Sequence, residues 1–577
     1  MKSNLKLKQK HSLIALLRFL LPASLLVVQQ SNAVEIHLPA NDPQCQSIPL
    51  PSLSELSDFK DIRSRYDLQR YEGMTIGKTS IVTMPIFNEY DPAESYSLYR
   101  FINGLHSPTM NYVIERQLLF KEGDVLEVRI IEESERILRE NNYLADAVVL
   151  PHQICGGKLH LVVISRDLWT LMPKLFFSRK GGYNKYGLTL EDENILGTGD
   201  TLFLDFIHDR ERDTTAVGYR TKHVFGSRVE LRATYSDTTD GAIKELEVIR
   251  PFYSLDANWS VGLTVNENIF KESLEAFNQD IDTFYHVENK YEVSTGYSRG
   301  VQKGFTQRYT FGFTRKLDLF EPVDDTPVTL PADRILAYPW IQYSLIEDNF
   351  VIYHNLNALH RIEDVPVGVE LNALVGYADK EFHSELSQWV FEFRYDDTPV
   401  AFDRHIVKSR LELNGFRDRT TRDYVNTIST LELTYYGLLA EMQRAFIRVA
   451  YDYGYNLSQD QLLTLGGEEG LRGYAPEFLL GDQRLLVNME FRHFFDLHYL
   501  HLFRFASVIF FDLGQTKNSN SAYGENSDLL TSAGIGMRIN SSKTNINRIV
   551  HLDLAFPLNE KDQVDKYEIR ITSSSTF

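Results

Sequence analysis

Two short segments near the C-terminal end of the chain carry the residues best suited to interact with one another. Leu465–Tyr474 reads LGGEEGLRGY and sets Arg472 in a glycine-rich stretch, and Phe510–Gly514 reads FFDLG and sets Asp512 among apolar residues. A carboxylate in an apolar strand needs a partner, because an isolated charge is costly to bury. We therefore expect a buried ion pair between the two residues. On a surface loop the arginine would instead be solvated and contribute ~0–1 kcal/mol.

No pattern in the sequence indicates covalent catalysis. There is no P-loop, no nucleophile elbow and no His-Glu-x-x-His motif. One group of side chains has the chemistry of zinc ligands: His493, Asp496, His498 and His501. Its spacing matches no zinc motif, and a turn between two strands explains it. We expect no enzymatic activity, no metal site and no cofactor.

The chain is acidic, with a formal net charge of −19 over 577 residues and a pI near 5.4. This balance argues against nucleic-acid binding, which requires a basic surface, and there is no polybasic patch suited to anionic lipid. The 31 tyrosines and 35 phenylalanines are typical of a membrane barrel with aromatic girdles. A soluble acidic enzyme shares this composition, so composition alone leaves both classes open.

Residues 1–33 are interpreted as a secretory signal peptide. Four lysines precede an apolar stretch at Leu13–Val28, and Ser31-Asn32-Ala33 supplies a small-x-small cleavage site. The alternative is an uncleaved anchor, but the apolar stretch is shorter than the ~20 residues that a spanning helix needs. The two cysteines, Cys45 and Cys155, lie in the exported part. An oxidising compartment permits a disulfide between them, and two unrelated thiols are the alternative.

Residues 34–73 are predicted to be a tail or linker, and residues 74–168 a small α+β domain. Met74–Phe87 favours a strand, whereas Asn111–Phe120 and Leu126–Glu140 place apolar residues at helical spacing. Two further short strands follow the second helix. The predicted order is strand, helix, helix, strand, strand.

Residues 169–577 alternate apolar and polar side chains in short runs and show no sustained helical period. The clearest runs are Arg228–Ser236, Asn258–Asn266, Phe305–Thr314 and Arg444–Tyr453. Each run has one apolar and one polar face, because side chains alternate across a strand. A soluble sandwich would bury the apolar face, whereas an outer-membrane barrel turns it toward lipid. No second set of strands is evident to cover it. We expect a mainly β protein with a C-terminal transmembrane antiparallel barrel, closed because lipid cannot satisfy a sheet edge.

Four motifs, in this order along the chain, resemble the barrel of the BamA/TamA superfamily of outer-membrane insertases and translocators. They are the turn Asn194–Gly199 with Gly197 and Gly199, the LGGEEGLRGY segment, the FFDLG strand, and a hairpin made of Ser532–Arg538, with Gly534 and Gly536, and Leu552–Leu558. The α+β segment resembles the POTRA domain of the same superfamily. The resemblance covers roughly residues 74–577 and implies a barrel of about 16 strands.

The resemblance also implies roles for single residues. LGGEEGLRGY is similar to the lid loop of the family, whose arginine meets the aspartate of the Phe-x-Asp-x-Gly strand inside the lumen. This implies a luminal Arg472–Asp512 pair, with Tyr474 wedged against the barrel wall. Phe577, at the end of the last strand, resembles the insertion signal of barrel proteins. The glycines that would let the loop and strand pack tightly are Gly466, Gly467, Gly470, Gly473 and Gly514.

The implied function is insertion or translocation of unfolded client proteins in a bacterial outer membrane, with the N-terminal domain in the periplasm. The POTRA-like domain would bind client strands at its sheet edge and offers a surface for a periplasmic or inner-membrane partner. The barrel seam would then let a client strand insert or cross. A single POTRA-like unit favours an accessory role. The alternatives are a dedicated two-partner secretion pore, and a passive porin or structural surface barrel without a client.

Overall fold

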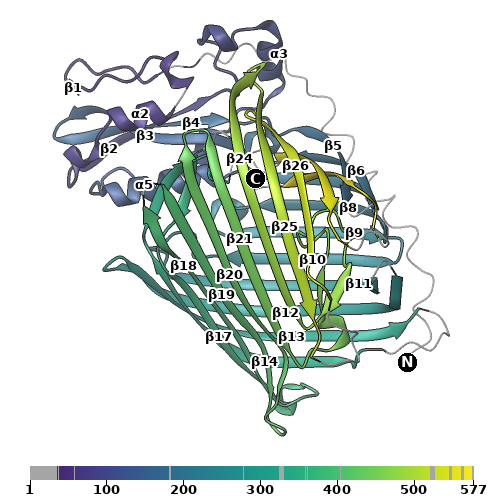
Figure 1. The fold of residues 1–577 in the computed structure, drawn as a ribbon. Helices are drawn as coiled ribbons and strands as arrows, with labels where there is room; N and C mark the ends of the chain where they lie inside the picture. The colour runs from purple at the N-terminus through teal and green to yellow at the C-terminus, as the bar shows by residue number, and fades with distance from the viewer. Residues whose placement is uncertain are drawn as a thin grey trace, which may run out of the picture.

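The computed structural model describes residues 36, 38–57, 59–180, 183–276, 279–323, 330–357, 359, 362–402, 404–519, 527–544, 549–559 and 564–574. It contains an N-terminal unit with a small sheet and a closed antiparallel β-barrel (Figure 1). Within the described ranges, no helix is long and apolar enough to cross a membrane. The predicted signal peptide and Phe577 lie outside the described residues.

The N-terminal unit contains a four-stranded sheet in the order β1-β3-β4-β2, in which β2 runs parallel to β4. The order from β2 onward is strand, helices, strand, strand, as the hydrophobic spacing predicts, with α3 as an additional helix. The elements are β1 (Gln46–Ser47), η1 (Glu55–Ser57), α2 (Phe59–Arg65), η2 (Leu68–Tyr71), β2 (Thr75–Met84), η3 (Pro92–Glu94), α3 (Ser97–Leu105), α4 (Asn111–Glu115), α5 (Val128–Arg139), β3 (Leu144–Cys155) and β4 (Lys158–Asp167).

Both faces of this sheet are buried. Residues of α4 and α5, such as Val113 and Ile131, pack on one face. The segment before β2, predicted to be a tail or linker, packs on the other face through Leu56, Phe59 and Ile62. Hydrophobic burial of this kind is the main force that holds a segment to a domain, so this segment is part of the folded unit.

One edge of the sheet, along β3, is covered by the same N-terminal segment. β1 pairs with Gln153 and Ile154, and the backbone N–H of Ile48 donates to the carbonyl oxygen of His152 at 2.8 Å. Nη2 of Arg63 donates to the carbonyl oxygen of Ala147 at 2.7 Å. A disulfide between Cys45 and Cys155 ties the segment to the end of β3. An edge covered in this way is not open for addition of another strand.

The barrel contains twenty strands within the described residues, not the approximately sixteen expected. The first six are only 8 to 10 residues long, and short strands with short turns fit more crossings into the same length of chain. The strands are β5 (Met172–Lys180), β6 (Tyr183–Asp192), β7 (Thr201–His208), β8 (Asp213–Thr221), β9 (Glu230–Thr238), β10 (Gly241–Arg250), β11 (Trp259–Ala276), β12 (Gln279–Gln302), β13 (Phe305–Pro322), β14 (Arg334–Glu347), β17 (Glu370–Ala378), β18 (Gln388–Phe402), β19 (His405–Asp418), β20 (Tyr424–Ala440), β21 (Gln443–Tyr455), β24 (Gln483–Tyr499), β25 (Phe503–Lys517), β26 (Leu530–Ser541), β27 (Ile549–Pro557) and β28 (Glu568–Ser574).

The barrel wall carries apolar side chains on its outside. On β11, for example, Trp259, Val261 and Leu263 are 50%, 47% and 40% exposed, whereas Ser260 between them is 8% exposed. An exposed apolar belt around a closed sheet is the surface that lipid covers in a membrane barrel. The mainly β fold and the closed antiparallel barrel predicted from the sequence are therefore confirmed.

Four further strands form two short hairpins in the barrel connections. One hairpin joins β15 (Phe350–His354) to β16 (Ile362–Pro366), and the other joins β22 (Leu463–Leu465) to β23 (Leu479–Gly481). Short 3₁₀ turns occur at η4 (Ile195–Gly197), η5 (Val224–Gly226), η6 (Lys380–Phe382) and η7 (Gln459–Gln461). Figure 1 shows the N-terminal unit gathered at one end of the barrel.

Candidate functional site: the lid loop and the seam of the barrel

Arg472 and Asp512 form a bidentate ion pair. Arg472 lies in the lid loop, defined here as residues 456–482 between β21 and β24. Its Nε donates to Oδ2 of Asp512 and its Nη2 donates to Oδ1, both at 2.7 Å. Its Nη1 donates to Oε1 of Glu490 at 2.8 Å. Arg472 is 7% exposed and Asp512 is 0% exposed. Charge-assisted bidentate bonds are among the strongest hydrogen bonds in proteins, so this contact fixes the loop.

Strand alternation places the partners of Arg472 on the inner face of the wall. Glu490 of β24 lies opposite Phe510 of β25 in the ladder, and Asn488 lies opposite Asp512. The amide of Asn488 donates to Oδ1 of Asp512 at 2.8 Å and to the carbonyl oxygen of Gly470 at 2.9 Å. Glu490 and Asn488 were not predicted, because inward polar residues occur on every strand of a barrel and the sequence does not tell which of them meets the lid.

An aromatic ring completes the pocket around the guanidinium. The Cζ atom of Arg472 lies 3.6 Å from the centroid of the Phe510 ring, which is a cation–π contact. The neighbouring β26 makes room for this ring at Gly534, where a Cβ atom would lie 2.3 Å from the ring. At Gly536 a Cβ would lie 1.9 Å from Oδ1 of Asp553. The two predicted hairpin glycines therefore permit close packing beneath the lid.

The glycines of the lid motif have two structural roles. Gly470 and Gly473 have φ values of 119° and 91°, which side-chain-bearing residues rarely adopt. At Gly466 a Cβ would lie 2.1 Å from the carbonyl oxygen of Ala475, so the loop folds back on itself there. The N–H of Gly467 donates to that same oxygen at 2.9 Å. On β25, a Cβ at Gly514 would lie 2.8 Å from the Leu465 side chain.

The lid loop also binds the last strands of the barrel. The hydroxyl of Tyr474, which is 1% exposed, donates to the carbonyl oxygen of Thr531 at 2.9 Å and to Oδ1 of Asn559 at 2.7 Å. The backbone N–H of Gly473 donates to Oε2 of Glu568 on β28 at 2.7 Å. Arg570, also on β28, donates to the carbonyl oxygen of Gly467. The lid therefore holds β28 from the inside, through Glu568 and Arg570, which were not predicted.

Among the residues that the structure describes, the contact between the first and last strands is the weakest in the wall. In these residues β28 and β5 share one registered pair, Ile571↔Arg179. On its other side, β28 pairs continuously with β27 from Ala555↔Glu568 to Ile549↔Ser574. Since the backbone N–H and C=O groups of a strand are obligatory hydrogen-bonding groups, a seam with one registered pair is the easiest place to separate two strands.

A cavity of about 880 Å³ lies inside the wall at this seam. Its lining includes Ser178 of β5, Thr572 and Ser573 of β28, and Glu468 and Glu477 of the lid loop. The cavity therefore touches both strands of the seam and the loop that closes it.

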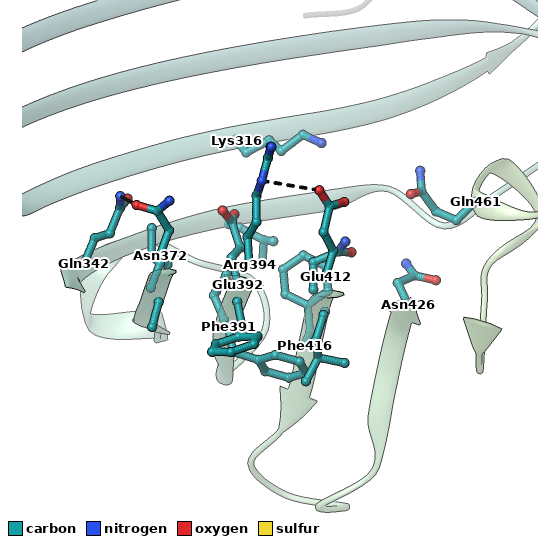
Figure 2. A pocket seen from close by; sticks show the side chains of 18 of the residues that line it. Lys316, Gln342, Asn372, Phe391, Glu392, Arg394, Glu412, Phe416, Asn426 and Gln461 are labelled. Carbon is teal, nitrogen blue, oxygen red and sulfur yellow. Dashed lines mark hydrogen bonds and ion pairs between the residues drawn. The ribbon is translucent and has the colours of Figure 1, made fainter. Parts of the chain in front are cut away.

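A second cavity, of about 550 Å³, lies against strands β13, β14, β17, β18 and β19. Figure 2 shows its polar lining, in which Arg394 points toward Glu412 at 3.7 Å and Gln342 toward Asn372 at 3.4 Å. Gln461 of the lid loop also borders it. The lumen is thus polar and is divided by the lid loop.

The predicted turn at Asn194–Gly199 docks the N-terminal unit. The Asn194 amide donates to Oγ1 of Thr109 at 2.8 Å, and the N–H of Met110 donates to the carbonyl oxygen of Gly197 at 3.0 Å. A Cβ at Gly197 would lie 2.3 Å from the carbonyl oxygen of Pro108, and one at Gly199 would lie 2.9 Å from the Val113 side chain. Gly197 and Gly199 have φ values of 78° and 75°. These glycines therefore permit close approach of the unit as well as the turn.

Helix α5 binds the hairpin of β15 and β16 at the same end of the barrel. Nε and Nη2 of Arg139 donate to the two carboxylate oxygens of Asp364 on β16, both at 2.8 Å. Leu359, in the connection between β15 and β16, is buried against Phe494 of β24 and Ala506 of β25. The connection between β15 and β16 therefore reaches from α5 to the far wall. The grouped histidines were predicted to lie at a turn, but only His501 does, between β24 and β25; His493 and His498 lie within β24, where Nε2 of His498 contacts Oγ of Ser542 at 2.8 Å.

Comparisons with known proteins found similar solved structures at low sequence identity. No family model and no curated protein matches the chain. Among solved structures, CdiB from Acinetobacter baumannii is 12% identical over 92% of this chain and 95% of that chain, with a TM-score of 0.42. BamA from Haemophilus ducreyi lacking POTRA domains 1–3 is 12% identical over 81% and 82%, with a TM-score of 0.38, and CdiB from Escherichia coli is 11% identical over 88% and 91%, with a TM-score of 0.36.

All three TM-scores lie below 0.5, so these likenesses carry no argument about function. The function proposed below rests on contacts within this chain.

Proposed function

We propose that this chain is an outer-membrane barrel of the translocator or insertase type, and that client strands enter the bilayer at the seam between β5 and β28. The observation that carries the proposal is that the described parts of β5 and β28 share one registered pair, Ile571↔Arg179. Strand edges with free backbone groups bind further strands. An opened β28 therefore offers a template on which a client strand can pair.

The lid loop is the element that controls the seam in this proposal. It is anchored to β24 and β25 through Arg472, and it holds β28 through Glu568 and Arg570. While these contacts persist, β28 stays in place despite its weak pairing with β5. Withdrawal of the lid releases the inner side of β28, and the seam then opens.

The membrane location follows from the apolar outer face of the barrel, which only lipid covers well. The N-terminal unit lies at the end where β5 begins, and we place that end in the periplasm. Its order of strands and helices supports a POTRA-like unit. We place client pairing at β28 and not at β3, because the N-terminal segment covers the edge of β3.

Secretion through the lumen is a second candidate, favoured by the polar cavities of about 880 and 550 Å³ on either side of the lid loop. In that case the lid would leave the lumen while the seam stays closed. A passive porin is disfavoured, because the lid loop and the connection between β15 and β16 occupy the passage.

A disulfide across the seam tests the proposal. Arg179→Cys with Ile571→Cys would lock β5 to β28, and the same substitutions at Ile535 and Leu554, which face each other across β26 and β27, provide a matched control. Each protein is placed in liposomes, and a small outer-membrane barrel unfolded in urea serves as the probe. The folded fraction is followed by heat-modifiable gel mobility.

The unlocked protein and the oxidised control pair are expected to accelerate folding of the probe relative to empty liposomes. The oxidised seam-locked protein is expected to lose that acceleration and to regain it on reduction. Acceleration that survives the lock would refute entry at the seam and favour the luminal route.

A further inference from the structure

Helix α3 presents an apolar stripe that nothing in the described chain covers. Leu98, Phe101 and Leu105 lie at positions i, i+3 and i+7, so they share one face of the helix. They are 57%, 63% and 47% exposed, and Tyr96 just before the helix is 61% exposed. Large apolar side chains scattered singly on a surface are ordinary, but a contiguous exposed patch marks an interaction site.

The opposite side of α3 is fixed to the barrel rim. The ring of Tyr99 stacks on Phe87 with centroids 4.2 Å apart, and its hydroxyl donates to the carbonyl oxygen of Leu500 at 2.5 Å. Trp169 and Leu502 pack against the same cluster. The helix is therefore held at the connection between β24 and β25, and its stripe has a defined position relative to the wall.

The barrel surface next to α3 is apolar up to this same connection. Leu497 and Tyr499 at the end of β24 are 51% and 54% exposed, and Phe503 at the start of β25 is 38% exposed. They continue the outward apolar belt of the barrel, which is the surface assigned to lipid. Figure 1 shows α3 beside the end of β24. The stripe on α3 thus extends a lipid-facing surface onto the N-terminal unit.

A turn at the same end of the barrel shows a related feature. Phe225, in η5 between β8 and β9, is fully exposed and has a φ of 49°. Bulky residues rarely adopt this conformation, and a strained residue that persists usually has a function. An aromatic side chain held outward at a turn is suited to the boundary between lipid headgroups and acyl chains.

We propose that the apolar stripe of α3 is an interfacial membrane anchor that binds the periplasmic leaflet of the lipid bilayer beside the barrel. The inference rests on the membrane location of the barrel and is independent of client insertion. An amphipathic helix of this kind lies in the plane of the interface, with its apolar side chains buried among the acyl chains. Arg100, exposed on the side of α3 away from the stripe, would then lie toward the lipid headgroups.

Single-cysteine labelling of the full chain tests the proposal. Both native cysteines are joined in a disulfide, so a new cysteine is the only free thiol. Leu98→Cys, Phe101→Cys and Leu105→Cys each carry an environment-sensitive fluorophore in vesicles of phosphatidylethanolamine and phosphatidylglycerol. Nitroxide-labelled lipids quench a fluorophore that enters the bilayer. Lys121→Cys, on an exposed part of the N-terminal unit, is the matched control.

We expect strong quenching and blue-shifted emission at the three stripe positions, and neither at Lys121. Adding Phe101→Asp to the Leu105→Cys protein should reduce the quenching, because burying the new carboxylate among acyl chains is unfavourable. Heat-modifiable mobility verifies that each barrel is folded. Quenching at the stripe no greater than at Lys121 overturns the anchor, as does shielding from a soluble quencher without lipid quenching, which would indicate a protein contact.

Discussion

Replacing Arg472 by methionine is the perturbation whose effect can be worked out best from the structure. The substitution keeps most of the side-chain volume but removes the charge. Asp512, which is 0% exposed, then loses a bidentate partner, and Glu490 loses one of its two arginine contacts. Removing one partner of a buried pair costs about 3–5 kcal/mol, because the other charge stays buried without compensation.

A free-energy change of this size determines whether the lid loop is seated in the lumen or withdrawn from it. A change of about 3–5 kcal/mol alters the ratio of seated to withdrawn lid by a factor of roughly 10² to 5 × 10³. We expect Arg472→Met to lower the temperature at which the barrel changes its gel mobility and to raise single-channel conductance in planar bilayers. Both follow from a lid that no longer fills the lumen.

A luminal arginine in a more exposed pair is the matched control. Arg448 bonds Glu432, and their side chains are 34% and 22% exposed. A solvated pair contributes ~0–1 kcal/mol, so Arg448→Met should leave mobility and conductance almost unchanged. Adding Asp512→Asn to Arg472→Met should restore part of the lost stability, since it removes the unpaired charge. If Arg472→Met behaves like Arg448→Met, the lid is not held by this pair.

Three further predictions concern the N-terminal unit and its attachment. Gly197→Ala should loosen docking by about 1–3 kcal/mol, because its φ is 78° and its Cβ would clash with the unit, and faster proteolysis of the unit would show it. Burial raises the pKa of Glu94, but the contact with Lys543, the backbone N–H of Asn88 and the charge of Arg166 together outweigh burial and lower the pKa below its ordinary 4.5. Its contribution to stability is therefore complete above pH 4.5 and is lost as the pH falls through the lowered pKa; proteolysis across this range should show a dependence on pH that Glu94→Gln lacks. Replacing Cys45 and Cys155 by alanine opens a loop with a sequence separation of 110 and should destabilise the N-terminal segment by up to about 4–5 kcal/mol, measured as earlier release of that segment in denaturant.

The strands of the barrel were predictable because the wall faces lipid on the outside and water on the inside, so apolar and polar side chains alternate along each strand. The run predicted at Asn258–Asn266 lies within β11 except for Asn258, and that at Arg444–Tyr453 lies within β21. Alternation shows where a strand is, but not how many strands close the ring. The count depended on strand lengths, and the short β5–β10 strands contain too few residues for their ends to be recognised.

The partners of the lid were only partly predictable. Arg472 and Asp512 stand out because each is a charge in an unusual setting, one among glycines and the other among apolar residues. Glu490, Glu568 and Arg570 lie at ordinary inward positions of their strands, where any polar residue is compatible with a water-filled lumen. Only the path of the lid through the lumen selects them.

The packing of the N-terminal segment could not be predicted from the sequence either. Its prolines and charges are typical of a linker, yet Leu56, Phe59 and Ile62 are buried against the sheet. These apolar residues are too few to show a helical period. Their burial depends on a partner surface far away in the sequence, which composition alone does not reveal.

The measurement that tests the account most directly is photo-crosslinking at the seam. A photoreactive residue in place of Ile571 on β28 is compared with the same residue in place of Ile535, which faces outward on the fully paired β26. The urea-unfolded barrel used as the folding probe is added to each protein in liposomes, and the sample is irradiated during folding. The account predicts an adduct with the probe at position 571 and none at position 535. Equal adducts at both positions, or none at 571 while folding is accelerated, would contradict entry at the seam.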